Sequence, residues 1–228
     1  WDNVLQEARD AGIPVLVTDR KIEVADPSLY AGFIGTDSLK EGRNAGQFVL
    51  DKFTEKRKRF EQTKEPITIV ELFGTEGSSV ANGRAEGFRE VLASHPEFQI
   101  IYSKSGDFLR SKGYELAVEF LDMYKDIDVL FSHNDGMTLG AIEAMEERGI
   151  RPGKDIVIVT IDAQQAAIDA LREGKVNCVI ECNPKTGPEI IRLAERLAAG
   201  QYIPRLQYVH EEVFYETDDL SLIEPRGY

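Results

Sequence analysis

The sequence has no excess of basic residues, which would be typical of nucleic-acid-binding proteins, and it has few cysteines and histidines. Its 228 residues include two cysteines and three histidines, and its net charge is -13. Proteins that bind nucleic acid neutralise phosphates with lysine and arginine, so this acidic chain argues against a nucleic-acid partner. The one basic run, Lys56 to Phe60, is expected to be the solvated end of a helix, where basic side chains complement the helix dipole.

The two cysteines, Cys178 and Cys182, are four positions apart in a run typical of a β-strand. In a strand their Cα atoms would be about 13 Å apart, whereas a disulfide needs less than about 7 Å. We expect no disulfide between them, and cysteine usage does not fix the cellular compartment. No apolar run approaches the roughly 20 residues of a membrane span.

Motifs for phosphate binding and covalent catalysis are also missing. The sequence contains no G-x-G-x-x-G, no G-x-x-x-x-G-K-[ST] and no nucleophile elbow. The glycine-rich run Gly74–Ser79 lacks the lysine of a phosphate-binding loop. The three histidines are scattered, so we expect neither a metal site nor a catalytic histidine. The sequence therefore implies no cofactor and no enzymatic activity.

What the sequence does contain is a series of short apolar runs that alternate with helical patterns. The runs do not alternate apolar and polar residues, which is typical of parallel strands that are covered on both faces. This order predicts an α/β protein with open parallel sheets. The expected strands are Ile13–Val17, Ala31–Gly35, Ile67–Phe73, Gln99–Tyr102, Asp128–Phe131, Ile156–Ile161 and Asn177–Ile180.

The helical patterns show a period of 3.6 residues. Three glycines, Gly149, Gly174 and Gly200, stand where left-handed helix stops belong. From Ile67 to Ile180 the alternation gives five strands, which is a complete flavodoxin-like unit. The first 36 residues give only one helix and two short strands, too few to bury both faces of a parallel sheet. We expect that two βα units, roughly 60 to 70 residues, precede Trp1 in the full protein.

Several polar side chains follow directly after these strands, where open α/β sheets bind ligands. The set combines carboxylates, guanidinium groups, an amide and an aromatic ring. Such groups suit a polyol, because a sugar hydroxyl donates to a carboxylate and accepts from an amide or guanidinium, and a ring covers the C–H face. The residues concerned are Asp19, Arg20, Arg84, Phe108, Asn134 and Asp162.

Each of these residues also has a purely structural interpretation. An aspartate after a strand is often a helix N-cap, which is the role expected for Asp135. Asp19 and Arg20 could form an ion pair, and Arg84 could be a solvated helix residue. Phe108 could belong to the core, and Asn134 could simply end its strand. Their convergence on one sheet edge favours the binding interpretation.

Several segments resemble the periplasmic sugar-binding proteins of ABC importers, of the ribose and galactose type and closest to galactofuranose-binding proteins. They are "IPVLVTDR", "IGTDSLKEGRNAGQ", "VELFGTEGSSVANGRAEGF", "SGDFLRSKG", "FSHNDGMTLGAIEA" and "GKDIVIVTIDA". The resemblance extends over essentially the whole chain. It implies the two-lobed type I fold, in which three crossing strands join the lobes and a monosaccharide is clamped between them.

The resemblance also implies where the lobes lie in this chain. The first lobe would comprise 1–36 and 183–212 and lack its N-terminal βα units. The second lobe would comprise 37–182 and 213–228 and be complete. Five residues would bind the sugar hydroxyls, Phe108 would lie beside the ring, and Ser38 would be a polar contact near the hinge. The five are Asp19 and Arg20 from the first lobe and Arg84, Asn134 and Asp162 from the second.

One position departs from the pattern: Cys182 stands where ribose-type relatives have glutamine, so the sugar is not expected to be ribose. The calcium loop of galactose-binding relatives is not visible, so no metal is expected. The resemblance implies a periplasmic or extracytoplasmic protein whose partner is a membrane permease. The full-length protein would be a monomer, whereas the present chain could self-associate through its unpaired strand edge.

Two other interpretations remain. The effector domain of a LacI-type repressor shares this fold but would need an N-terminal DNA-binding head, and the acidic charge disfavours it. An α/β enzyme could use Asp162 as a general base, but no acid, nucleophile or metal partner stands at a useful spacing.

Overall fold

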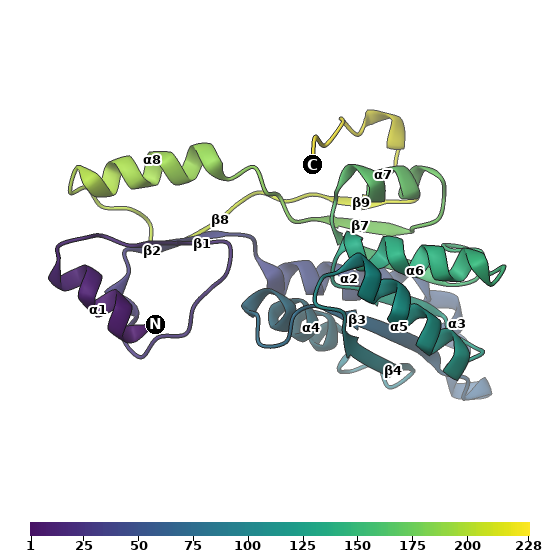
Figure 1. Ribbon diagram of the computed structural model, residues 1–228. Coiled ribbons are helices and arrows are strands. Elements are labelled where there is room, and N and C mark those ends of the chain that lie inside the picture. The colour runs from purple at the N-terminus through teal and green to yellow at the C-terminus, as the bar shows by residue number, and fades with distance from the viewer. The chain divides into compact units, whose positions relative to one another are not determined.

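A computed structural model describes all residues, 1–228. The chain forms two compact units, each assembled from separate segments (Figure 1). Unit 1 consists of Trp1–Asp37 and Asn183–Glu211, and unit 2 of Ser38–Cys182 and Glu212–Tyr228.

Unit 2 contains a six-stranded sheet in the order β4-β3-β5-β6-β7-β9. All neighbours pair in parallel except β7 and β9, which are antiparallel. The first five strands therefore have the flavodoxin order, with the second strand in sequence at the edge. The α/β fold class is thus confirmed. The strands are β3 (Ile67–Phe73), β4 (Phe98–Ser105), β5 (Val129–Ser132), β6 (Val157–Asp162), β7 (Cys178–Glu181) and β9 (Val213–Tyr215).

Helices cover both faces of this sheet, so most residues of the central strands are buried and apolar. On one face, α2 (Ser38–Lys52) and α4 (Ser79–Leu92) pack on Ile69, Phe131 and Ile161. On the other face, Leu72, Leu130 and Ile158 pack against three further helices. These are α5 (Arg110–Met123), α6 (Asp135–Glu147) and α7 (Gln165–Arg172).

Glycines let the helices of each layer approach closely. A methyl group at Gly87 of α4 would lie 2.1 Å from the carbonyl oxygen of Leu39 in α2, and one at Gly140 of α6 would lie 2.1 Å from that of Arg110 in α5. Both contacts are with backbone, which cannot move aside. The predicted helix stops are confirmed, since Gly149, Gly174 and Gly200 have φ values of +71°, +71° and +69° just beyond the ends of their helices.

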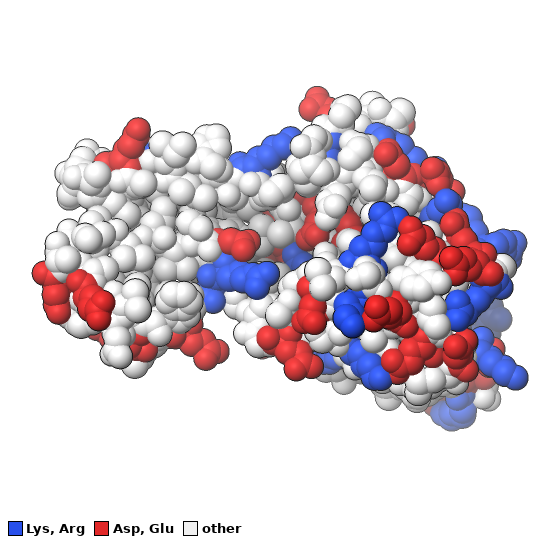
Figure 2. Space-filling model, viewed as in Figure 1, with Lys and Arg blue, Asp and Glu red and all other residues white.

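The basic run is placed differently from the prediction. Helix α3 (Thr54–Thr63) contains Lys56 to Phe60 in its middle rather than at its end. Two of the basic side chains are engaged: Lys56 bonds the carboxylate of Asp128 at 2.7 Å, and Arg57 bonds Glu97 at 2.8 Å. Figure 2 shows acidic and basic side chains interspersed over the visible face of unit 2 rather than gathered by sign.

Unit 1 contains a three-stranded parallel sheet in the order β1-β2-β8. Ile34, Leu193 and Ile203 form its small core. The β8 strand and the β9 strand of unit 2, three residues each, were not predicted from the sequence. The elements of unit 1 are α1 (Asp2–Asp10), β1 (Leu16–Thr18), a 3-10 turn (Pro27–Leu29), β2 (Gly32–Gly35), α8 (Gly187–Ala198) and β8 (Leu206–Tyr208).

Neither Cys178 nor Cys182 forms a disulfide. None of the helices combines the length and the apolar character that crossing a membrane requires.

Candidate functional site

Arg84 of α4 occupies the centre of a polar cluster at the carboxyl edge of the unit 2 sheet, with 2% of its side chain exposed. Its Nε donates to Oε2 of Glu41 at 2.6 Å, and its Nη1 donates to the carbonyl oxygen of His133 at 2.5 Å. Its Nη2 lies 3.5 Å from Oδ1 of Asp162. These contacts use three of the five guanidinium N–H groups, and two remain for a ligand.

Burial alone would lower the pKa of Arg84, but the charges of Glu41 and Asp162 outweigh it and raise the pKa above its usual value. The guanidinium therefore stays charged although it is buried. A buried arginine with unused N–H groups is a strong donor for ligand oxygens.

Asp162 is the last residue of β6, and its backbone is unusual. Its φ is +127°, and the φ of Ala163 is +65°, both positive values that residues other than glycine rarely adopt. The Asp162 carbonyl accepts the N–H of Cys182 at 3.1 Å, which ties it to the end of β7. Its side chain is 24% exposed, and burial raises its pKa to about 6, an effect that Arg84 partly offsets.

Asn134 is the N-cap of α6, a role the sequence had assigned to Asp135. Its Oδ1 accepts the backbone N–H of Met137 at 3.0 Å. Its Nδ2 donates to the carbonyl oxygen of Phe108 at 3.1 Å. An N-cap residue has an extended backbone and a side-chain acceptor, and Asn134 has both. Helix α6 therefore begins at Asp135, one residue earlier than predicted. Each polar atom of Asn134 keeps capacity for one further bond.

Asp135 is instead fully buried beneath the site. It accepts hydrogen bonds from Oγ1 of Thr160 and from the backbone N–H of Gln164, both at 2.7 Å. Burial and the neighbouring charge of Asp162 raise the pKa of Asp135 well above its usual value. Asp135 thus fastens α6 to the segment after β6 and fixes the backbone that carries Asp162.

Phe108 lies in the loop between β4 and α5 with a φ of +61°. Its ring packs over Gly74, since a methyl group there would be 2.1 Å from the ring. The guanidinium carbon of Arg84 is 5.9 Å from the ring centroid. The partly buried ring therefore stands beside the strongest donor of the cluster.

A second buried network supports these groups from beneath. His133 donates from Nε2 to Glu71 of β3 at 3.1 Å, and its Nδ1 accepts the backbone N–H of Gly74 at 3.3 Å. Burial would raise the pKa of Glu71, but hydrogen bonds from His133 and Arg89 lower it to about 2. His133 therefore contacts Gly74 through its ring and Arg84 through its carbonyl oxygen.

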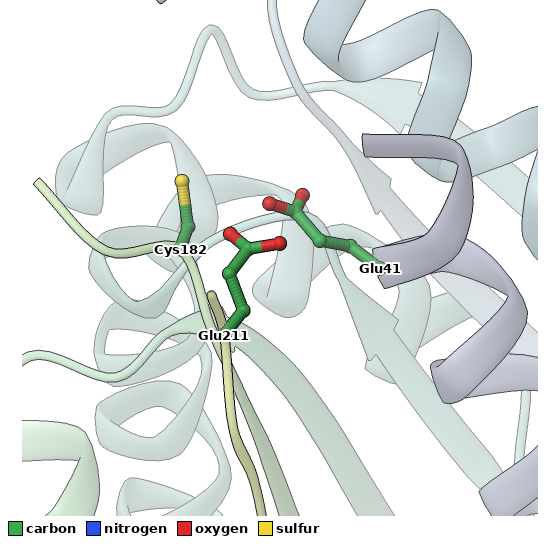
Figure 3. A group of neighbouring side chains, drawn as sticks. All are labelled: Glu41, Cys182 and Glu211. Carbon is green, nitrogen blue, oxygen red and sulfur yellow. The ribbon is translucent and has the colours of Figure 1, made fainter. Parts of the chain in front are cut away.

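Glu41, in the first turn of α2, is a member of the cluster that the sequence reasoning missed. It is 1% exposed, and its Oε1 has no hydrogen-bond partner. The sequence contained a signal for this role, because Glu41 stands four and eight positions before Ala45 and Val49, on one face of the helix. Ala45 and Val49 are fully buried, and a carboxylate on a buried face requires a partner. Figure 3 shows the Glu41 side chain extending toward Cys182.

The remaining predicted residues are Ser38 of unit 2 and the pair Asp19 and Arg20 of unit 1. Ser38 is partly exposed, with its Oγ 3.5 Å from the carbonyl oxygen of Ser79 at the start of α4. Asp19 and Arg20 belong to unit 1, where they form an exposed ion pair of 3.8 Å. The structural interpretation of Asp19 and Arg20 thus has direct support, and their role in binding stays a prediction.

Unit 2 thus brings together four of the seven predicted residues: Arg84, Phe108, Asn134 and Asp162. They combine unused donors, a carboxylate and an aromatic ring within one sheet edge. Groups of this kind recognise neighbouring hydroxyls of a polyol, which both donate and accept.

Comparison with known proteins places the chain in a family. Residues 1–201 match the model of the periplasmic binding protein domain. The chain belongs to this family of periplasmic binding proteins. It is 40% identical over 221 residues to the galactofuranose-binding protein YtfQ of Escherichia coli (strain K12), covering 96% of this chain and 67% of that protein.

Solved structures agree with this placement. A Mycobacterium smegmatis protein in complex with β-D-fucofuranose is 43% identical with a TM-score of 0.89, over 95% of this chain and 69% of that one. The periplasmic binding protein component of the arabinose ABC transporter from Shewanella sp. ANA-3 was solved with α- and β-L-arabinofuranose. It is 36% identical with a TM-score of 0.85, over 94% of this chain and 68% of that one. The resemblance to periplasmic sugar-binding proteins that the sequence segments indicated is confirmed. These relatives favour a solute-binding protein over a repressor domain.

Proposed function

We propose that the full-length protein is the extracytoplasmic solute-binding component of an ABC importer and binds a monosaccharide in its furanose form. The observation that carries the proposal is the cluster around Arg84, with Asp162, Asn134 and Phe108 at one sheet edge. The cluster has donors, an acceptor and an apolar ring, as a neutral sugar requires. The partner in transport would be a membrane permease.

The furanose specificity is supported by the sugars of the relatives. One binds galactofuranose, one was crystallised with fucofuranose and one with arabinofuranose. D-Fucose is galactose without the 6-hydroxyl, and L-arabinose lacks carbon 6 altogether. The three sugars therefore share a five-membered ring and differ in the group outside it, which makes them a natural series of probes.

The remaining predicted contacts are part of the proposal. Asp19, Arg20 and Ser38 would add polar contacts to those of the Arg84 cluster. No metal is part of the proposed site, because the groups around Arg84 suit neutral hydroxyls.

A sugar panel on the full-length protein tests the proposal. D-Galactose, D-fucose, L-arabinose and D-ribose are compared by thermal shift and by calorimetry. A ligand at 100 times its Kd stabilises the folded state by about 2.7 kcal/mol, which is readily visible as a rise in Tm. We expect galactose, fucose or arabinose to stabilise the protein more than ribose, with and without EDTA.

Two results would contradict the proposal. If no sugar of the panel raises the Tm, the ligand class is wrong. If EDTA abolishes binding, the metal-free site is wrong. The variant Arg84→Lys is the control, because it keeps the charge but loses the fork of N–H groups and should bind at least tenfold more weakly.

A further inference from the structure

Glu41 has one oxygen that the protein itself does not satisfy. Its Oε2 accepts the Nε–H of Arg84 at 2.6 Å, while its Oε1 has no partner although the residue is 1% exposed. A buried acceptor without a donor is unfavourable, and such groups in native proteins call for an explanation.

A second ion pair between the same two helices shows what a purely structural glutamate does. Arg43 of α2 and Glu90 of α4 also bridge the helices, on the exposed side. There both carboxylate oxygens are used, with Nε to Oε2 at 2.9 Å and Nη2 to Oε1 at 3.1 Å. The Glu41 pair uses only one oxygen, because Arg84 directs its other two nitrogens to His133 and Asp162.

The location of Glu41 also favours a ligand over a helix contact. One of its oxygens lies within 4.8 Å of the Cys182 sulfur, and the Cys182 N–H donates to the carbonyl oxygen of Asp162. Glu41 therefore extends toward Cys182 (Figure 3), the residue whose backbone is bonded to Asp162. The two unused N–H groups of Arg84 belong to the same cluster.

We infer that Oε1 of Glu41 accepts a hydroxyl of the bound sugar, so that Glu41 helps to determine which sugar the protein selects. This inference rests on the proposed function. The sugar hydroxyl would donate a hydrogen bond to Oε1, and its oxygen would accept one from an unused N–H group of Arg84. A site that is built to pair with a hydroxyl rejects the analogue that lacks it, because its own polar groups are then left unpaired.

The test is a double-mutant cycle in which the second change is made on the sugar. Wild-type and Glu41→Gln full-length proteins are titrated calorimetrically with D-galactose and its 2-, 3- and 6-deoxy derivatives. In the Glu41→Gln variant the amide oxygen would keep the Arg84 N–H, so the amide NH2 group replaces the acceptor. The furanose fraction of each sugar is the same in both titrations and cancels in the ratio of Kd values.

We expect one deoxy derivative to bind the wild type about tenfold or more weakly than galactose. For Glu41→Gln that penalty should shrink to less than about threefold, while the other penalties stay unchanged. The matched control is Glu90→Gln, which removes the same charge from the exposed helix pair and should show the wild-type pattern.

If Glu41→Gln weakens all four sugars by the same factor, Glu41 only positions Arg84 and the inference is wrong. If the wild type binds none of the sugars, the proposed function fails instead, which is a distinguishable result. Melting curves check that the variant is folded. If it is not, Glu41→Asp provides the same cycle, because it keeps the charge but withdraws the carboxylate by one methylene.

Discussion

His133, directly after β5, and Glu71 of the neighbouring strand β3 form a buried pair, with Nε2 of the histidine 3.1 Å from Oε1 of the glutamate and neither side chain exposed. Because Gly74 donates to Nδ1, the ring is neutral and carries its proton on Nε2. Burial lowers the pKa of His133, which keeps it neutral, and Glu71 only partly offsets this. The pair fixes the backbone beneath Phe108 and the carbonyl oxygen that receives Arg84.

We therefore expect His133→Ala to destabilise the protein by about 2–3 kcal/mol, since it leaves a buried charge with one partner fewer. His133→Gln should cost less, because its amide N–H can replace the Nε2 donor to Glu71. Urea unfolding measures both. Equal losses in the two variants would show that the hydrogen bond to Glu71 contributes little.

Asn134 combines a helix cap with a predicted sugar contact, and two substitutions separate these roles. Asn134→Ala should lower stability by about 1 kcal/mol through loss of the cap, and weaken sugar binding by about 1–3 kcal/mol. Asn134→Asp keeps a capping oxygen but cannot donate to Phe108. We expect it to keep the stability that the cap contributes but to lose affinity, as unfolding and calorimetry would reveal. Full affinity in both variants would remove Asn134 from the site.

Sugar affinity should depend on pH through Asp162, whose pKa is raised to about 6. If the ionised carboxylate accepts the hydroxyl, affinity should fall about tenfold between pH 7 and pH 5. In the unliganded protein, the folding stability that depends on Asp162 should change with pH in the opposite direction to the sugar affinity. A raised carboxyl pKa means that the folded state holds the proton more tightly than the unfolded state. Its contribution to stability is present at low pH and is lost as pH rises from about 4 to 6.

Calorimetric titrations at several pH values check this expectation, with Asp162→Asn as the control. The asparagine variant should bind weakly at all pH values and show a flat profile between pH 5 and 7. A wild-type profile that is equally flat would mean that Asp162 does not titrate in the binding step.

The close approach of α2 and α4 depends on Gly87. Gly87→Ala would place a methyl group 2.1 Å from the carbonyl oxygen of Leu39 and 2.8 Å from the N–H nitrogen of Arg43. We expect a loss of about 1–3 kcal/mol in stability, and weaker binding, because α4 carries Arg84. The control is Gly187→Ala at the start of α8, where nothing lies within 4 Å. It should be neutral or slightly stabilising in thermal melts.

The amino-acid sequence by itself determined the α/β class and most strand positions, because both depend on local patterns. The buried run Ile67–Phe73 coincides with β3, and the glycines at 149, 174 and 200 end their helices as predicted. Apolar periodicity and left-handed backbone conformations are properties of short segments, so they can be recognised without knowing the neighbours in space.

Only the tertiary structure decided how the polar residues divide their roles. Asn134 rather than Asp135 caps α6, because Asp135 is drawn to Thr160, 25 positions away. Glu41 joins the site through Arg84, 43 positions away, and His133 pairs with Glu71, 62 positions away. The partner of a buried charge is set by which strands and helices lie side by side, and no local pattern contains that information.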